Sequence, residues 1–124
     1  MEFISKELIK ELSNPGVVSR QLLNPDNSSS EKVTITEVHL EAGAIQPRHT
    51  HNASEQIWYA IKGHGKLLLA DDKEKDFKAS DVVRFEENDV HGLLNDSNDE
   101  FVYISVTAPS IHFGYAYEEK MNNI

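Results

Sequence analysis

The sequence predicts an all-β protein, built as a sandwich or a barrel. From residue 33 onward, short runs of β-branched and aromatic residues alternate with clusters of turn-forming residues. The turn clusters, such as Gly63-His64-Gly65 and Asp71 to Lys75, recur close to the spacing of antiparallel hairpins. The expected strands cover Val33 to Leu40, Gln56 to Ile61, Lys66 to Ala70, Val82 to Phe85, His91 to Leu94, Phe101 to Thr107 and Ile111 to Tyr117.

The segment before these strands has a different pattern. Ser5 can cap a short helix with Leu8, Ile9 and Leu12 on one face, and Asn14-Pro15-Gly16 would end that helix. The stretch 24–30 is rich in turn formers and has no apolar periodicity, which is typical of a linker. We therefore expect residues 1–30 to form an N-terminal helix and extension, and residues 31–124 to form the barrel.

Composition bounds the function. The 124 residues suit one domain, and 39% hydrophobic with 27% charged residues is ordinary for a globular protein. A net charge of -9 disfavours nucleic acid and anionic membrane surfaces as partners. The absence of cysteine restricts any metal site to nitrogen and oxygen ligands. The N-terminus has no secretory apolar region and no run is long enough to span a membrane, so we expect a cytoplasmic protein.

The histidines supply the candidate site. His49 and His51 flank Thr50, and side chains two apart on an extended strand point to the same face, so both imidazoles can converge on one ion. The segment from Gly43 to Gly63 resembles the first cupin motif, G-x5-H-x-H-x(3,4)-E-x6-G. The segment from Ser80 to Asn95 resembles the second motif, G-x5-P-x-G-x2-H-x3-N. Residues that match are Gly43, His49, His51, Gly63, His91 and Asn95, whereas Ser80, Glu86 and Asn88 replace Gly, Pro and Gly.

Similarity to the small single-domain cupins implies a double-stranded jelly-roll barrel with both motifs on neighbouring strands. The resemblance also implies one divalent metal ion held by His49, His51 and His91, with a fourth ligand from the first motif. The ligand types do not determine whether this metal is Fe, Mn, Ni, Zn or Co. The Asn88 replacement is mild, because Asn tolerates a left-handed backbone better than other non-glycine residues.

Two residues compete for the fourth ligand. Glu55 has the shorter allowed spacing from His51 but lies one residue too far from Gly63, whereas Gln56 satisfies both distances. Only one of them can face inward, because neighbouring residues of a strand point to opposite faces. We favour Gln56, and this choice leaves the full charge of the ion uncompensated and suits an anionic ligand.

Three further residues are candidates for a substrate pocket. Trp58 and Tyr103 are first of all packing residues, but aromatic side chains also line small-molecule sites. His112, near the C-terminus, could reach the mouth of the pocket. We interpret His39 and His64 as structural or exposed, since neither has a partner in the motifs.

The function follows from the metal site. With open coordination positions, the centre suits dioxygenase-like chemistry or isomerase/lyase-like chemistry on a small organic molecule. The alternative is a non-catalytic barrel that binds or senses a small ligand, because fold alone does not establish activity. By analogy with other small cupins we expect a homodimer.

Overall fold

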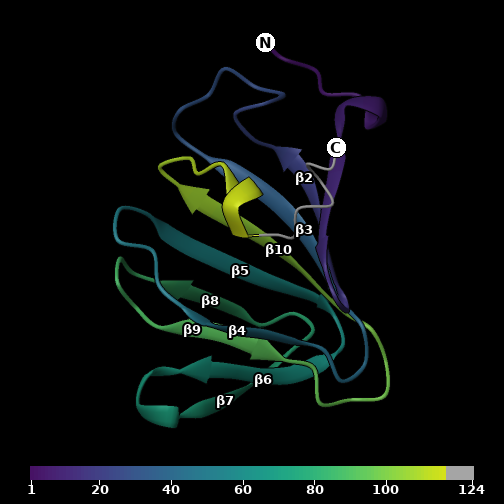
Figure 1. The fold of residues 1–124 in the computed structure, drawn as a ribbon, viewed down its shortest axis with the longest axis vertical. Helices are drawn as coiled ribbons and strands as arrows, with labels where there is room; N and C mark the ends of the chain where they lie inside the picture. The colour runs from purple at the N-terminus through teal and green to yellow at the C-terminus, as the bar shows by residue number, and fades with distance from the viewer. Residues whose placement is uncertain (117–124) are drawn as a thin grey trace.

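A computed structural model describes residues 1–116 of the chain, and these residues form two antiparallel sheets (Figure 1). The strands of the larger sheet are β1 (Lys10–Asn14), β2 (Val17–Leu23), β3 (Thr34–Leu40), β5 (Glu55–Lys62), β8 (Val82–Phe85) and β10 (Phe101–Ala108). Those of the smaller sheet are β4 (Ile45–His49), β6 (His64–Leu69), β7 (Glu74–Lys78) and β9 (His91–Leu94). Strand orders are β1-β2-β3-β10-β5-β8 and β4-β9-β6-β7.

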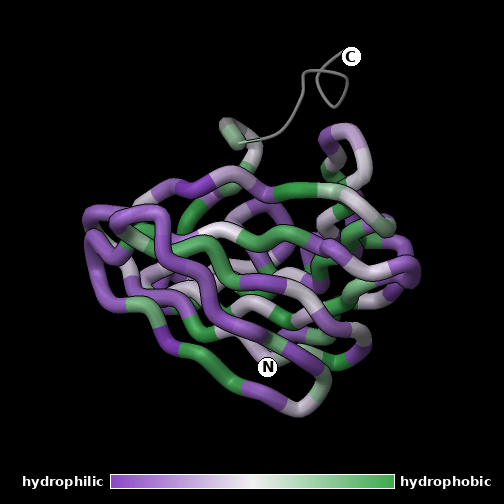
Figure 2. Tube along the Cα trace, turned by 90° about the horizontal axis from the view of Figure 1, so that it is seen from below, coloured by the Kyte–Doolittle hydropathy of each residue, from purple (hydrophilic) through white to green (hydrophobic). Residues whose placement is uncertain are grey.

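The predicted all-β fold is confirmed. Six of the expected runs coincide with β3, β5, β6, β8, β9 and β10, with boundaries shifted by at most two residues at either end. β3 alternates buried and half-buried residues along its whole length. Figure 2 shows hydrophobic and hydrophilic residues interleaved along the chain, as expected for sheets that bury one face and expose the other.

The predicted N-terminal α-helix is not confirmed. In its place the chain makes one 3-10 turn, Lys6–Leu8, and then enters β1. Pro15 and Gly16, which were predicted to end the helix, instead form the turn of a hairpin in which Asn14 pairs with Val17. Gly16 has φ 75°, the left-handed value that the second central residue of such a turn requires. Because β2 also pairs with β3, the N-terminal hairpin lies in the same sheet as the later strands.

The prediction of a last strand from Ile111 to Tyr117 is also wrong for the residues that the structure describes. Ile111 and His112 are irregular, and Phe113–Ala116 form a 3-10 turn, while residue 117 lies outside the described residues. Ile111 exchanges hydrogen bonds with a side chain, donating its N–H to Thr34 Oγ1 and accepting the Thr34 hydroxyl proton. The aromatic residues here raise β propensity, but a strand also needs a neighbouring ladder, and residues 111–116 have none.

The core lies between the two sheets. Trp58 stands at its centre, with its ring centroid 4.4 Å from Tyr103, 5.0 Å from Phe85 and 6.5 Å from Phe77. Leu67, Leu93 and Phe101 also belong to this cluster. Over the described part of the chain, no helix has the length and apolar character needed to cross a bilayer.

Candidate metal centre

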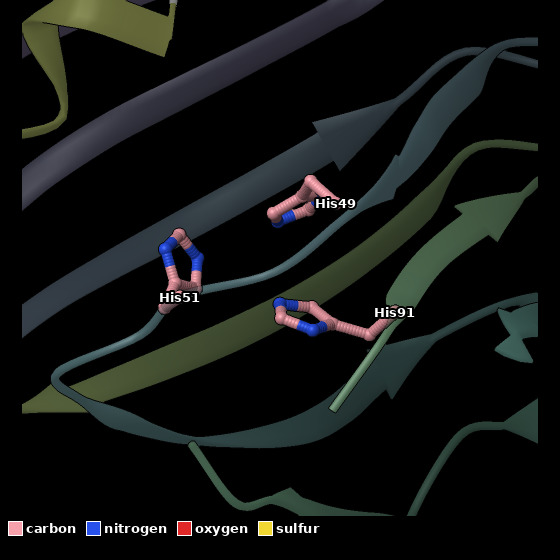
Figure 3. A group of neighbouring side chains, drawn as sticks. All are labelled: His49, His51 and His91. Atoms are coloured by element: carbon pink, nitrogen blue, oxygen red, sulfur yellow. The ribbon is translucent and has the colours of Figure 1, made fainter. Parts of the chain in front are cut away.

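Three histidines from two separate stretches of the chain meet in the structure (Figure 3). His49 ends β4, His51 follows it in the next loop, and His91 begins β9. Strand pairing brings two of them together directly, because His49 lies opposite His91 in the β4–β9 ladder. The candidate ligand atoms of the three rings all lie within 4.8 Å of one another. In Figure 3 the rings point toward one shared space.

Backbone carbonyls fix the tautomers of two rings. His49 Nδ1 lies 2.9 Å from Pro47 O, and His91 Nδ1 lies 2.9 Å from Asp89 O. A carbonyl oxygen can only accept, so each Nδ1 carries the proton and donates. When such a ring is neutral, its Nε2 atom therefore keeps the lone pair that binds a metal ion.

The side-chain amide of Gln56 is fixed in the same way. The Trp58 indole N–H donates to Gln56 Oε1 at 3.0 Å, and Gln56 Nε2 donates to Thr107 Oγ1 at 2.9 Å. The indole nitrogen is a donor only, so the atom facing it must be the amide oxygen. Gln56 is 4% exposed, and its Oε1 lies 3.1 Å from His91 Nε2.

The two facing atoms are both acceptors. With the His91 proton on Nδ1, the Nε2 lone pair meets the lone pairs of Gln56 Oε1, and no proton lies between them. His51 Nε2 is also buried and has no hydrogen-bond partner in the described part of the protein. Buried polar atoms without partners are costly, and one cation binding these atoms would satisfy them together. The residues therefore fit a divalent ion bound by nitrogen and oxygen.

Burial keeps these rings neutral. Burial, together with a smaller contribution from the neighbouring His49 ring, lowers the pKa of His51 to about 4. Burial likewise lowers the pKa of His91 to about 4, although the hydrogen bond to the Asp89 carbonyl works in the opposite direction. Both imidazoles are thus unprotonated at neutral pH, as metal ligands must be.

Glu55 points away from the histidines. Its carboxylate accepts a hydrogen bond from Arg84 Nε at 2.6 Å, and both side chains are exposed. The strand alternation that buries Gln56, Trp58 and Ala60 on the inner face of β5 leaves Glu55 outside. Its acidic group is therefore committed to a surface ion pair.

A cavity of about 590 Å³ opens beside the histidines, with His49, His51 and Gln56 in its wall. Trp58 and Tyr103 also line it, and the Tyr103 hydroxyl donates to Gln46 Oε1 at 2.6 Å. His112 points elsewhere, because its Nε2 pairs with Asp26 Oδ2 at 2.8 Å, and the structure gives it no place in the lining.

Comparison with known proteins assigns the family. Residues 36–107 match the cupin domain family, over more than half of the chain. The chain belongs to the cupins. A curated relative, an uncharacterized protein of Methanocaldococcus jannaschii, is 26% identical to this cupin over 87 residues, which covers 70% of the chain and 69% of the relative.

Solved structures share the fold at low sequence identity. KdgF from Halomonas sp. matches this cupin with a TM-score of 0.73 at 17% identity, covering 89% of this chain and 96% of that chain. The polyketide cyclase RemF from Streptomyces resistomycificus matches with a TM-score of 0.73 at 16% identity, covering 98% and 93%. At such identities the similarity establishes the architecture alone.

The cupin keeps the backbone shape of its second motif despite the missing glycines. Ser80 and Asn88, which replace those glycines, have φ 82° and φ 70°. The Asn88 N–H also donates to His51 O at 2.8 Å, so the turn before His91 supports the loop that holds His51. Sequence reasoning missed this link, as it missed Thr107 beside Gln56, because neither contact leaves a local pattern.

Proposed function

We propose that this cupin binds one divalent metal ion through His49, His51, His91 and Gln56, and a small organic molecule beside it. The observation that carries the proposal is the contact between His91 Nε2 and Gln56 Oε1, two acceptors held 3.1 Å apart. The Nε2 atom of His51, which has no hydrogen-bond partner within residues 1–116, supports it independently. A bound cation would account for both features, whereas neither neutral tautomer of His91 satisfies both of its ring nitrogens.

The ligand set determines the electrostatics of the site. Three neutral imidazoles and a neutral amide leave the charge of a divalent ion uncancelled, so the site favours an anionic oxygen on the bound molecule. When bound, such an ion supplies Lewis acidity or, for iron or manganese, redox chemistry with dioxygen. The carbonyl groups of Pro47 and Asp89 orient two of the rings through their Nδ1 protons.

The cavity offers few groups for proton transfer. In the described portion of its wall there is no Asp, Glu or Lys side chain, and Glu55 is held by Arg84. This favours chemistry centred on the metal, either dioxygenase-like or isomerase/lyase-like, over catalysis by a side-chain acid and base. The alternative is a non-catalytic cupin that binds or senses the same small molecule.

Metal analysis tests the centre. We expect natively expressed protein to hold close to one divalent ion per chain, from Fe, Mn, Ni, Zn or Co, and His91→Ala to lose it. His64→Ala is the matched control, because His64 is exposed and lies outside the cluster of His49, His51 and His91. Wild-type protein without metal, also after incubation with each ion, would refute the centre. Dioxygen uptake with small phenols or thiols then tests the oxygenase reaction, and a redox-inert metal without uptake would count against it.

The remaining expectations concern partners and location. We propose a homodimer that acts on or binds a small molecule and that does not bind nucleic acid, with the net charge of -9 as support for the latter. The cytoplasmic location remains a prediction from the sequence.

A further inference from the structure

The cavity has a wall of hydroxyl groups that the metal centre does not use. Ser19 on β2, Thr36 on β3 and Ser105 on β10 all line the cavity, and each is at most 4% exposed. Thr36 lies opposite Ser105 in the β3–β10 ladder, and Ser105 lies opposite Trp58 in the β10–β5 ladder. We call Ser19, Thr36 and Ser105 the hydroxyl wall.

These hydroxyls have hydrogen-bonding capacity to spare. In the part of the chain that the structure describes, the side chains of Thr36 and Ser105 make no hydrogen bond to the protein. Ser19 Oγ accepts from Gln21 Nε2 at 2.8 Å, so its own proton remains for another acceptor. Gln21 Oε1 is also buried and has no hydrogen-bond partner among the described residues. Buried hydroxyls of this kind need partners from solvent or from a ligand.

The wall carries no charge. Arg48 supplies the only charged side chain among the described lining residues, and its guanidinium donates instead to Leu69 O and Lys73 O. A charged group far from the metal would therefore lose its hydration without gaining a partner, which is unfavourable. The wall suits neutral hydroxyl groups, which both donate and accept hydrogen bonds as its own side chains do.

The distance across the sheet sets the length of the ligand. Gln56 belongs to β5, and two strand spacings separate β5 from β3, a distance of about 10 Å. A molecule with one end at the metal centre thus reaches Thr36 if it is a short chain or ring of small-molecule size. Trp58 and Tyr103, which line the cavity, supply apolar surface for its carbon skeleton.

We infer that the cavity binds a small polyhydroxylated carboxylate, with its carboxylate at the metal centre and its hydroxyl groups against the hydroxyl wall. The inference rests on the proposed metal centre, because the cation attracts the carboxylate end. The inference adds the chemical class of the bound molecule, which the metal-binding residues alone do not specify.

Calorimetry on the zinc-loaded full chain tests this with gluconate and hexanoate, two carboxylates of equal carbon number that differ in their hydroxyl groups. We expect gluconate to bind at least about tenfold more tightly, which corresponds to two ordinary hydrogen bonds. The double variant Thr36→Val with Ser105→Ala should lose that preference, because gluconate loses hydrogen bonds that hexanoate does not make. Thr36→Ser, which keeps the hydroxyl, should retain the preference for gluconate. If the double variant does not fold, Ser19→Ala tests the hydroxyl wall in its place and should weaken the preference.

The outcomes separate the two proposals. Zinc binding without a preference for gluconate overturns the inference about the hydroxyl wall and leaves the metal centre standing. A preference that survives in the double variant also overturns it, since other groups would then recognise the hydroxyls. Failure of the wild-type chain to bind zinc or any other divalent ion overturns both.

Discussion

At the scale of single residues, the orientation of one amide decides what faces the histidines. Trp58 can only donate to Gln56, and Thr107 accepts from its amide nitrogen, so the oxygen is directed toward His91. Rotation of the amide by half a turn would bring its NH2 group against the indole N–H. Gln56 is thus held with its amide oxygen toward His91, the orientation that the proposed metal centre requires.

Thr107→Val should weaken metal binding without unfolding the barrel. The substitution keeps the side-chain shape but removes the acceptor of the Gln56 amide nitrogen, so the amide oxygen is less firmly directed. We expect the zinc affinity to fall by about tenfold, the lower end of the range for such supporting groups. Competition with a chromophoric zinc chelator at neutral pH measures the change.

Thr34→Val is the matched control for this prediction. Thr34 lies opposite Thr107 in the β3–β10 ladder and is equally buried. Its hydroxyl donates to Ile111 O and not to Gln56. This variant should lose stability while keeping wild-type zinc affinity. Equal losses of affinity in both variants would show that Thr107 acts through general stability.

At the scale of elements, the turns between strands carry the glycines of the first cupin motif. Gly43 and Gly63 both have positive φ, at 81° and 101°. Their surroundings differ, because a Cβ on Gly63 would lie 2.9 Å from Glu100 O, whereas a Cβ on Gly43 would meet nothing within 4 Å. Substitutions at these two glycines therefore distinguish backbone strain from steric crowding.

Gly63→Ala should therefore be more damaging than Gly43→Ala. We expect Gly43→Ala to cost about 1 kcal/mol in the free energy of unfolding, the strain of a left-handed alanine. Gly63→Ala should cost about 1–3 kcal/mol more, since the chain around Glu100 must also move. Urea unfolding of the two variants measures both values, and equal costs would show that the β5–β6 turn relaxes freely.

The outer face of the large sheet carries a network of charges around His39. His39 contacts Glu37 and Glu100, at 3.0 and 3.1 Å, and Arg20 and Lys62 contact the same two carboxylates. Burial acts to lower the pKa of His39, but the hydrogen bonds to Glu37 and Glu100 outweigh it, and the pKa lies above 6.5. The network joins β2, β3 and β5 to the start of β10.

The raised pKa makes this stabilisation depend on pH. A histidine whose pKa is higher in the folded state binds its proton more tightly there, so folding gains stability while the ring is charged. The gain is complete below pH 6.5, the value for an unfolded histidine, and disappears as the pH rises through the raised pKa. Metal-free wild type should exceed His39→Gln in melting temperature by more at pH 5.5 than at pH 8.5. A constant difference would contradict this.

At the scale of the whole molecule, the described acidic side chains lie on the outside and the hydroxyl wall lies in the cavity. The chain has a net charge of -9, yet no carboxylate belongs to the described wall of the cavity. The acidic side chains of the named ion pairs, such as Glu55, Asp76 and Glu100, lie on the outside. A cation in the cavity would thus be the dominant local charge, inside a protein whose exterior repels anions.

The expected homodimer is a prediction at this scale. Ile57, Tyr59, Ile61 and Val82 lie exposed on β5 and β8, where the outer face of the large sheet reaches its edge. Large apolar side chains gathered on one face are typical of an interface with a second copy. Light scattering should give a mass near twice 14.0 kDa for the wild type, and a mass near 14.0 kDa for Tyr59→Lys. A monomeric wild type would refute the prediction.

The sequence determined which residues are available for the site, and tertiary structure decided how they are used. Alternation along β3 and β5 was sufficient to predict an all-β fold, because it is a local periodicity. The cluster of His49, His51 and His91 was predicted from the resemblance of two separate segments to the cupin motifs. Pro15 and Gly16 fit a helix end as well as a hairpin turn, and only pairing with β2 distinguishes these possibilities. The Thr107 contact with Gln56 and the hydroxyl wall depend on which strands are neighbours, and pairing between strands distant in sequence is set by the packing of the whole barrel.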